Sequence, residues 1–372
     1  MASDAFPNEI QDRILDFLHN SRSTLKACAL VCRAWVPTSR YHLFSEIVLN
    51  QHTVHFEELI QNPNCTIRSC VHLMGSHTAA TATLNALRNL TPSSLHLRRW
   101  LFSDLLIGPF SSVECLKLDY VDFGYSQGVV DIFATFPNVR ELSMTSCSRL
   151  VQSRECVYVS CPPPLRSLEF AYCKMDPLLH DFIRGRIVPT NVFSIHRLRY
   201  DDIPVVGEYF SMFGNVLQEI RIGFSYDRHD VLGMSNLTLC FALACLILPS
   251  EGFCASARLH CLTGFQRLSL DTRFYGPGFS DLHIKLLASI LNIIPSSTLK
   301  KLVLEIPTPP IEPRFAGWRQ IGEVLQQPRF SQLTELVFIP TTEPYEHFER
   351  WIREDLRALE ERGILSCPRW LT

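Results

Sequence analysis

The chain has 372 residues and a formal net charge of −2, with 35 Lys and Arg against 37 Asp and Glu. A balance this close to neutral lacks the basic excess of nucleic-acid-binding domains, and no block of like charges predicts a charged tail. The length suits a small module followed by a domain of about 320 residues, which exceeds one ordinary compact core and favours a repeat architecture.

The first 50 residues predict a small module of three helices. Pro7 suits the first position of a helix, where its missing N–H costs nothing. The apolar residues that follow are spaced so that they share one helix face, at Ile10, Ile14, Phe17 and Leu18. This spacing predicts an amphipathic first helix.

A second helix is predicted to follow a serine cap and to end at Pro37. Its apolar residues recur with helical spacing at Leu25, Cys28, Ala29 and Cys32. A short third helix is predicted over residues 38–44, before a strand at 46–49. Three such helices bury little surface alone, so the module needs a partner or an adjoining domain to cover its apolar groups.

The residues of this module resemble the F-box family. The shared features are the Phe6-Pro7 opening, Glu9, the pair Ile14 and Leu15, Leu18, Leu25, the run Val31-Cys32-Arg33 followed by Trp35, and the closing Leu43-Phe44. The family usually has Leu at the position of Phe6, and Phe keeps an apolar anchor there. The resemblance covers residues 1–50 and no more of the chain.

The resemblance implies that the module docks onto the Skp-type adaptor of an SCF ubiquitin ligase, and through it onto a cullin, while residues 51–372 select a protein substrate. The residues expected to bind the adaptor are Pro7, Ile10, Ile14, Leu15, Leu18, Leu25, Val31 and Trp35. The sequence does not separate those that face the adaptor from those that face the module's own core. The alternative is that the helices only cap the end of a larger core.

After the module, a short apolar pattern repeats. Each copy has two apolar residues separated by one other residue, and a further apolar residue three positions before the first of the two. The copies are Val113-Leu116-Leu118, Val139-Leu142-Met144, Leu165-Leu168-Phe170, Ile195-Leu198-Tyr200, Leu217-Ile220-Ile222, Phe265-Leu268-Leu270, Leu299-Leu302-Leu304 and Leu333-Leu336-Phe338. The middle positions are 26, 26, 30, 22, 48, 34 and 34 residues apart. Fainter copies contain Leu73 and Leu95.

The pattern is similar to leucine-rich repeats, in which each unit supplies one short strand and a returning helix or loop. It predicts an α/β fold, an irregular solenoid with a curved parallel sheet and outer helices. Cys147 and Cys173 each follow the last apolar residue of a repeat by three places, where the cysteine-containing class of these repeats packs a side chain beneath the turn. A helix over 345–361 is expected to cap the last repeat.

The middle residue of each strand core should point away from the core and line the concave face. That row is predicted to contain Lys117, Ser143, Glu169, Arg199, Arg221, Ser269, Val303 and Val337, and the next outward row Asp119, Thr145, Ala171, Asp201, Gly223, Asp271, Glu305 and Ile339. We expect the first row to bind the substrate, with Lys117, Glu169, Arg199 and Arg221 as the leading candidates. The alternative is that these are ordinary solvated strand residues.

Neither a membrane segment nor an active site is predicted. The opening MASDAFPNEI lacks the features of a secretory signal, and the apolar part of Val231–Leu248 is too short to span a bilayer and suits a buried helix. The 14 cysteines lie mostly in apolar runs without zinc-knuckle spacing, which favours reduced thiols and a cytoplasmic or nuclear location. We find no catalytic, nucleotide-binding or zinc-protease motif, and expect no cofactor and no metal.

Three functions therefore remain open. The first is a substrate receptor of a ubiquitin ligase, and the second is a repeat scaffold without a ligase role. The third is an enzyme built on the repeats, which would need a cleft with clustered ionisable groups. The first two differ in adaptor binding.

Overall fold

The computed structural model describes residues 7–19, 21–43, 47–49, 62, 73–76, 92–99, 109–123, 131–148, 165–224, 258–271, 281–295, 297–306, 316–340 and 348–366. The chain forms two compact units, Met1–Pro163 and Pro164–Thr372. The segment Val231–Leu248, predicted as a buried helix, lies outside the described residues. Within the part that is described, no helix combines the length and the apolar character that crossing a bilayer requires.

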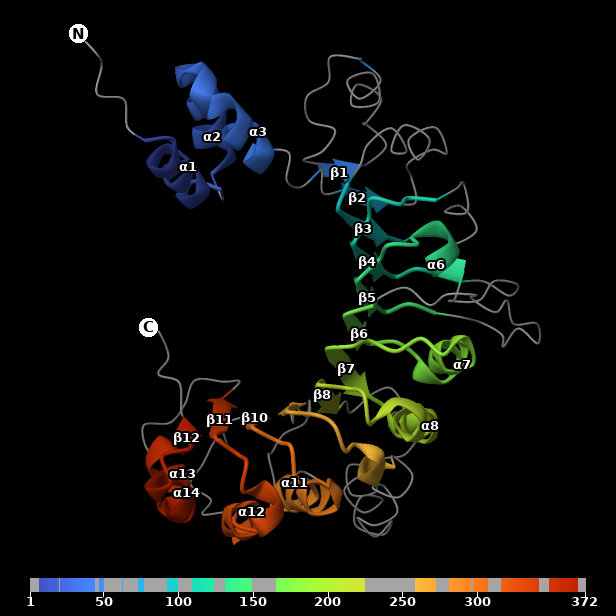
Figure 1. Cartoon of the computed structure of the whole chain (residues 1–372), viewed down its shortest axis with the longest axis vertical. Helices are drawn as coiled ribbons and strands as arrows, with labels where there is room; N and C mark the ends of the chain where they lie inside the picture. Colours follow the sequence, from blue (N-terminus) through green and yellow to red (C-terminus); the bar gives the residue numbers. More distant parts are fainter. Residues whose placement is uncertain are drawn as a thin grey trace, which may run out of the picture. The chain divides into compact units, whose positions relative to one another are not determined.

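The first unit begins with the helical module (Figure 1). Its elements are α1 (Asn8–Phe17), α2 (Arg22–Val31), the 3-10 helix η1 (Arg33–Trp35) and α3 (Val36–Leu43). The three predicted helices are present, but Pro37 does not end the second one. It is the second residue of α3, where no backbone N–H is needed.

The module has a small core of its own. Leu15, Leu25 and Cys28 are buried, and Leu18, Trp35 and Leu43 pack against them. Polar side chains on α1 tie it to the elements that follow: Trp35 Nε1 donates to Gln11 Oε1 (2.9 Å), Thr38 Oγ1 donates to Asp12 Oδ1 (2.6 Å), and His42 Nε2 lies 2.8 Å from Asp16 Oδ1. These contacts fix the faces that α1 turns inward.

The same unit continues with strands that pair in parallel, each with the next (Figure 1). They are β1 (Ile47–Leu49), β2 (Leu73–Ser76), β3 (Ser94–Arg98), β4 (Cys115–Asp119) and β5 (Glu141–Thr145), with the short helix α6 (Ile132–Thr135) before β5. In β3 to β5 the apolar residues of the repeat pattern are buried and their neighbours are more exposed. This alternation confirms the predicted strand cores here.

The second unit is also an α/β arrangement with an all-parallel sheet, consistent with a solenoid-like fold. Its strands are β6 (Ser167–Ala171), β7 (Val192–Leu198), β8 (Glu219–Phe224), β9 (Arg267–Asp271), β10 (Lys301–Ile306), β11 (Glu335–Pro340) and β12 (Leu365–Ser366). Its helices are α7 (Met175–Gly185), η4 (Tyr200–Asp202), α8 (Ile203–Phe213), η6 (Leu259–Cys261), α11 (Asp281–Ile293), α12 (Ala316–Leu325), η7 (Pro328–Phe330), α13 (Phe348–Asp355) and α14 (Arg357–Glu361).

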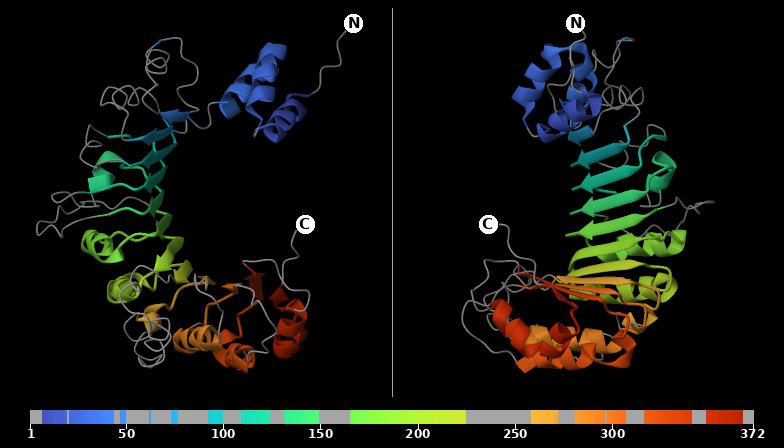
Figure 2. Two further views of the ribbon diagram at one scale, coloured as in Figure 1. Left: turned by 180° about the vertical axis from the view of Figure 1, so that it is seen from behind. Right: turned by 60° about the vertical axis from the view of Figure 1, so that its left-hand side comes forward.

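Helices α7, α8, α11 and α12 lie along one side of these strands, as Figures 1 and 2 show. The core fills the space between them and the sheet with buried aliphatic and aromatic side chains. The predicted C-terminal helix is instead two helices, α13 and α14, with a break at Leu356. The apolar residues Ile352, Leu356 and Leu359 of this segment are buried.

One predicted repeat was placed wrongly. The register pairs Leu168 with Phe193 and Phe193 with Ile220, so the strand core of this repeat is Phe193 and Ile195. The middle positions 168, 193 and 220 are then 25 and 27 residues apart instead of 30 and 22. The error arose because the run VFSIHRL has apolar residues in two phases, and the strand pairing shifts between Ile195 and Leu198.

The predicted turn cysteines are confirmed. Cys147 and Cys173 are buried free thiols. Cys147 Sγ donates to the carbonyl oxygen of Leu118, 3.2 Å away on the preceding strand, and Cys173 Sγ donates to that of Ala171 at 3.5 Å. Leu198, also buried, is the last residue of β7 and follows the core residue Ile195 by the same three places. A small or apolar side chain under each turn therefore fills the space between successive repeats.

The residue directly after each strand from β3 to β6 has a left-handed backbone. These corner residues are Arg99 (φ 59°), Tyr120 (φ 55°), Ser146 (φ 50°) and Tyr172 (φ 59°). A left-handed conformation costs a residue other than glycine about 1–2 kcal/mol. At each corner the left-handed residue turns the backbone away from the strand. After β4, β5 and β6 the residue that follows it is buried.

A buried carboxylate joins two repeats in the second unit. Asp202 Oδ1 accepts the backbone N–H groups of Met175 (2.9 Å) and Asp176 (3.1 Å), which begin α7. Its other oxygen has no hydrogen-bond partner among the described residues. Burial raises the pKa of Asp202, and the two N–H groups offset part of that rise.

We expect Asp202 to make stability depend on pH. A carboxyl group whose pKa is raised in the folded state contributes stability below its unfolded pKa of about 3.9, and this contribution is lost as pH rises through the folded pKa. On acidification from pH 7, the unfolding free energy of the natural chain should therefore rise relative to that of Asp202→Asn, which keeps an acceptor for both N–H groups. Denaturant titrations of both chains at several pH values measure this difference.

A difference that stays constant from pH 7 to pH 4 would contradict the assignment. Asp202→Ala serves as the control for the cap itself: it also lacks the ionisable group, but it removes the acceptor, so it should be less stable than Asp202→Asn by about 1 kcal/mol at every pH.

Candidate functional site

The helical module exposes large apolar side chains. On α1 the exposed fractions are 44% for Ile10, 42% for Ile14 and 86% for Phe17; at the end of α2 they are 87% for Leu30 and 64% for Val31. The three residues of α1 are four and three positions apart, so they form one stripe along the helix. We call Ile10, Ile14 and Phe17 the α1 stripe.

The predicted adaptor-binding residues divide into two groups. Pro7, Ile10, Ile14 and Val31 are exposed. Leu15 and Leu25 have no exposed surface and form the core, while Leu18 and Trp35 are half-buried against it. The sequence left open which of these residues face the adaptor and which face the module's own core. The structure places Leu15 and Leu25 in that core, where their side chains hold the module together.

The physical reason is the geometry of the helix. Neighbouring residues on an α-helix point about 100° apart, so Ile14 and Leu15 cannot share a face. With Leu15 in the core, Ile14 must face outward. The sequence reasoning missed Leu30. The run Ala29-Leu30-Val31 indicates an exposed apolar residue, because three consecutive residues cannot all lie on the buried face of α2.

The exposed side chains give the module a reason to bind a partner. Burying apolar surface contributes about 25 cal/mol per Å², or about 1.5–3 kcal/mol for a whole Ile, Leu or Phe side chain. Singly exposed apolar residues are common on proteins, but a stripe of them marks an interaction surface. The α1 stripe is therefore the strongest candidate for a docking surface on the module.

A second candidate surface is the face of the sheet in the second unit that points away from the helical side. The register places six residues in one row across β6 to β11: Glu169, Ser194, Arg221, Ser269, Val303 and Val337. Ser194, Ser269 and Val337 are buried, so the accessible part of the row is made by the other three. Glu169 and Arg221 are where they were predicted. Arg199 is not in the row, because it follows the end of β7, and Ser194 takes its place. Asp201 likewise lies in η4, and His196 takes its place in the next row.

In the first unit, Lys117 lies in the corresponding row with His96 and Ser143, as predicted. Asp119 and Thr145 are paired in the next row. Lys117 is exposed on the middle of β4. The register and this exposure thus confirm the prediction that the side chain of Lys117 points away from the core.

The sequence reasoning missed an outward row of charges in the second unit. The register aligns Glu219, Arg267, Lys301 and Glu335 one residue before the buried core of each strand. Glu219 accepts from Arg221 Nε at 2.6 Å and from Arg267 Nη1 at 3.2 Å, and Lys301 Nζ donates to Glu335 at 2.6 Å. The period of two residues along a strand, counted back from the predicted row, would have found them.

These ion pairs change how Arg221 is interpreted. Its guanidinium group is already held by Glu219, so it does not offer a free charge to a ligand. Exposed pairs of this kind contribute about 0–1 kcal/mol each. Their main effect is to balance charge on this face, which leaves the half-buried Val303 and the buried Val337 among compensated neighbours.

A Ser, a His and a Glu meet on β6 and β7, and their geometry bears on the enzyme hypothesis. His196 Nε2 lies 3.1 Å from Ser194 Oγ and 3.0 Å from Glu169 Oε1. A catalytic triad uses the two different ring nitrogens, one for the serine and one for the carboxylate. Here both partners meet the same nitrogen, so the histidine cannot take a proton from the serine while the carboxylate orients it.

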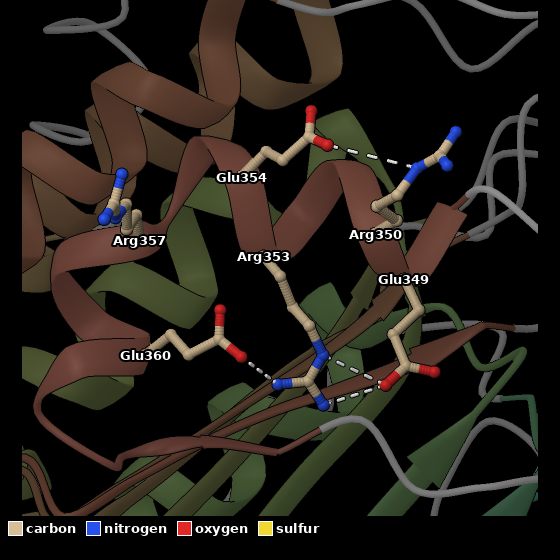
Figure 3. Close-up of a pocket in the computed structure, with 6 residues that line it drawn as sticks. All are labelled: Glu349, Arg350, Arg353, Glu354, Arg357 and Glu360. Atoms are coloured by element: carbon tan, nitrogen blue, oxygen red, sulfur yellow. Dashed lines mark hydrogen bonds and ion pairs between the residues drawn. The ribbon is translucent and has the colours of Figure 1, made fainter.

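A hollow on α13 and α14, of about 520 Å³, is lined by charged side chains alone. Figure 3 shows Arg353 between Glu349 and Glu360, with Glu349 at 2.8 Å. Arg350 lies 3.9 Å from Glu354, and Arg357 pairs outside the hollow with Glu361 at 3.0 Å. Because each arginine is paired, this hollow is a surface ion-pair network that ties α13 to α14.

Among the described residues, no three His, Cys, Asp or Glu side chains are grouped so as to hold a metal ion. Comparison of the chain with protein-family models, with curated proteins and with solved structures gives no match. The functional argument therefore depends on the chain's own surfaces, of which the α1 stripe is the clearest.

The division of the module into core and surface can be tested residue by residue. Leu15→Ala should weaken the module by about 2–5 kcal/mol, because it leaves a cavity in the core. Ile14→Ala should change the stability by less than about 1 kcal/mol, because the side chain is half in solvent. Amide hydrogen exchange over residues 7–43 of the full chain measures both effects locally. Equal acceleration by the two variants would contradict the division.

Proposed function

We propose that this protein is the substrate receptor of an SCF-type ubiquitin ligase. Its N-terminal module acts as an F-box that binds the Skp-type adaptor and, through it, the cullin. The strands and helices that follow act as leucine-rich repeats that bind the target protein. The chain carries out no chemistry itself and acts by holding the target near the ubiquitin-transfer machinery of other subunits.

The observation that carries the proposal is that the apolar residues of the module divide into a buried core and an exposed group. The residues that resemble an F-box include both the core residue Leu15 and the exposed residues Ile14 and Val31. A helical cap with no partner would gain nothing from an outward apolar stripe, since exposed apolar groups favour aggregation. A docking module needs one.

The repeat assignment has its own support. The strand cores recur at 25–27 residues from β4 to β8, which falls in the range of leucine-rich repeats. Cys147 and Cys173 are buried beneath their turns, as the cysteine-containing class of these repeats requires. Such repeats offer a broad sheet face, which suits the capture of a protein segment.

The second candidate is a repeat scaffold without a ligase role. It shares the sheet faces with the first proposal, and it differs in predicting no adaptor binding. The α1 stripe favours the receptor over the scaffold.

Co-purification separates the two. The full chain should retain the Skp-type adaptor and the cullin of its cell, and a chain without residues 1–50 should retain neither. Ile14→Glu combined with Phe17→Glu should reduce the adaptor recovered by at least tenfold, because burying two charges at the interface costs several kcal/mol. Its helical circular dichroism should stay unchanged, since both side chains face solvent.

Met212→Glu combined with Val216→Glu is the matched control, because it places two charges at apolar positions that are 45% and 48% exposed, on α8 and just after it, outside the module. It should retain the adaptor fully. If the natural chain fails to bring down the adaptor, or if the double variant binds as well as the natural chain does, the receptor proposal fails and the scaffold remains.

A further inference from the structure

Three basic side chains lie on β3 and β4 and at the corner after β3, in the first unit. Arg98 is the last residue of β3, Arg99 is its left-handed corner residue, and Lys117 lies on β4. All three are exposed, and so is half of the ring of Tyr120, the corner residue of β4. We call Arg98, Arg99, Lys117 and Tyr120 the basic cluster.

Two like charges share one aromatic ring in this cluster. The guanidinium carbons of Arg98 and Arg99 lie 5.8 Å and 6.0 Å from the centre of the Tyr120 ring. Each gains a cation–π attraction of about 0.5–1 kcal/mol at an exposed site. The two charges repel each other across the ring, and a bound anion would relieve that repulsion.

The carboxylate of Asp119 pairs with a histidine and not with the cluster. Asp119 is the register partner of Arg98, yet its Oδ2 lies 2.7 Å from His96 Nε2 on the neighbouring strand. Within the part of the chain that the structure describes, Arg98, Arg99 and Lys117 form no ion pair within 4.0 Å. The cluster therefore differs from the charged row of the second unit, where Glu219, Arg221 and Arg267 compensate one another.

We propose that the basic cluster binds an acidic peptide segment of the target, through at least two closely spaced Asp or Glu side chains. Planar guanidinium groups match carboxylates with paired hydrogen bonds, and the exposed face of Tyr120 adds apolar contact. Arg98 and Lys117 are diagonal neighbours on adjacent parallel strands, because Lys117 pairs with His96, two residues before Arg98; the strand spacing and rise put their backbones about 8 Å apart. Cations spread in this way suit a row of carboxylates better than one compact phosphate group.

This inference deepens the proposed receptor function by giving the chemistry of the segment that the repeats hold, and it depends on that function only for the segment's role as a ligase target. The binding itself is measured on the purified full chain, without adaptor. The probes are three fluorescein-labelled peptides of equal length: one with interspersed Asp and Glu, one with Asn and Gln at those positions, and one with a single phosphoserine in a neutral sequence.

The test variant and its control carry the same two types of substitution, at positions with comparable backbone conformation. Arg98→Gln with Arg99→Gly removes both guanidinium groups, and Gly adopts the φ of 59° at position 99 without strain. The control is Arg140→Gln with Arg258→Gly: Arg140 already pairs with Glu114 at 3.8 Å, and Arg258 is an exposed residue with a φ of 47°. Both variants lose two positive charges.

We expect the acidic peptide to bind more tightly than its neutral counterpart, and less tightly as salt rises. The Arg98/Arg99 variant should weaken this binding about tenfold or more, and the control less than about twofold. If the double variant fails to fold, the single variant Lys117→Gln should still weaken binding measurably at low salt.

The inference is overturned if the acidic and neutral peptides bind alike, if the cluster variant matches its control, or if only the phosphoserine peptide binds. Adaptor co-purification with the same Arg98/Arg99 variant keeps the two proposals apart, because the module is untouched. Retained adaptor with no peptide binding would reject the cluster alone, and peptide binding without adaptor would reject the ligase role alone.

Discussion

Each repeat of this chain has one short strand with apolar side chains that only neighbouring repeats can cover. Leu116 and Leu118 of β4 illustrate this, because both are fully buried although the strand has only five residues. The parallel register with β3 and β5 places the equivalent leucines and methionine beside them. The fold within each unit therefore depends on neighbour contacts, and stability is shared among repeats.

The same constraint decides what the surface can do. Once the alternate residues of a strand are committed to the core, the others must face outward at fixed intervals. In the second unit these positions carry charges that pair with one another, while in the first unit they bring out Arg98 and Lys117, which form no ion pair with a described residue. One sheet geometry thus gives a compensated face in one unit and a basic cluster in the other.

The helical module follows a different rule. Its core of Leu15, Leu25 and Cys28, with three half-buried neighbours, is too small to use all of its apolar residues. Ile10, Ile14 and Phe17 remain outside on one stripe of α1. Hydrogen bonds from Trp35 and Thr38 to α1 hold the helix in this orientation. A partner that covers the stripe would complete the burial that the module cannot achieve alone.

The sequence was sufficient for the parts of the structure that a single period specifies. The alternation in CLKLD and ELSMT predicted the strands β4 and β5, and the cysteines at 147 and 173 were predicted beneath their turns. It failed where two phases compete, as in VFSIHRL, because the choice between Phe193 and Leu198 depends on pairing with β6 and β8. The sequence also could not tell that Ile14 is exposed and Leu15 buried, since a motif gives the residue types but not the direction in which each side chain points.

The measurement that tests the central claim most directly is a calorimetric titration of the purified full chain with the purified Skp-type adaptor at several temperatures. The account predicts one-to-one binding with a negative heat-capacity change, because the α1 stripe moves from water into an apolar interface. Absence of binding would contradict it, and so would binding that leaves the heat capacity unchanged.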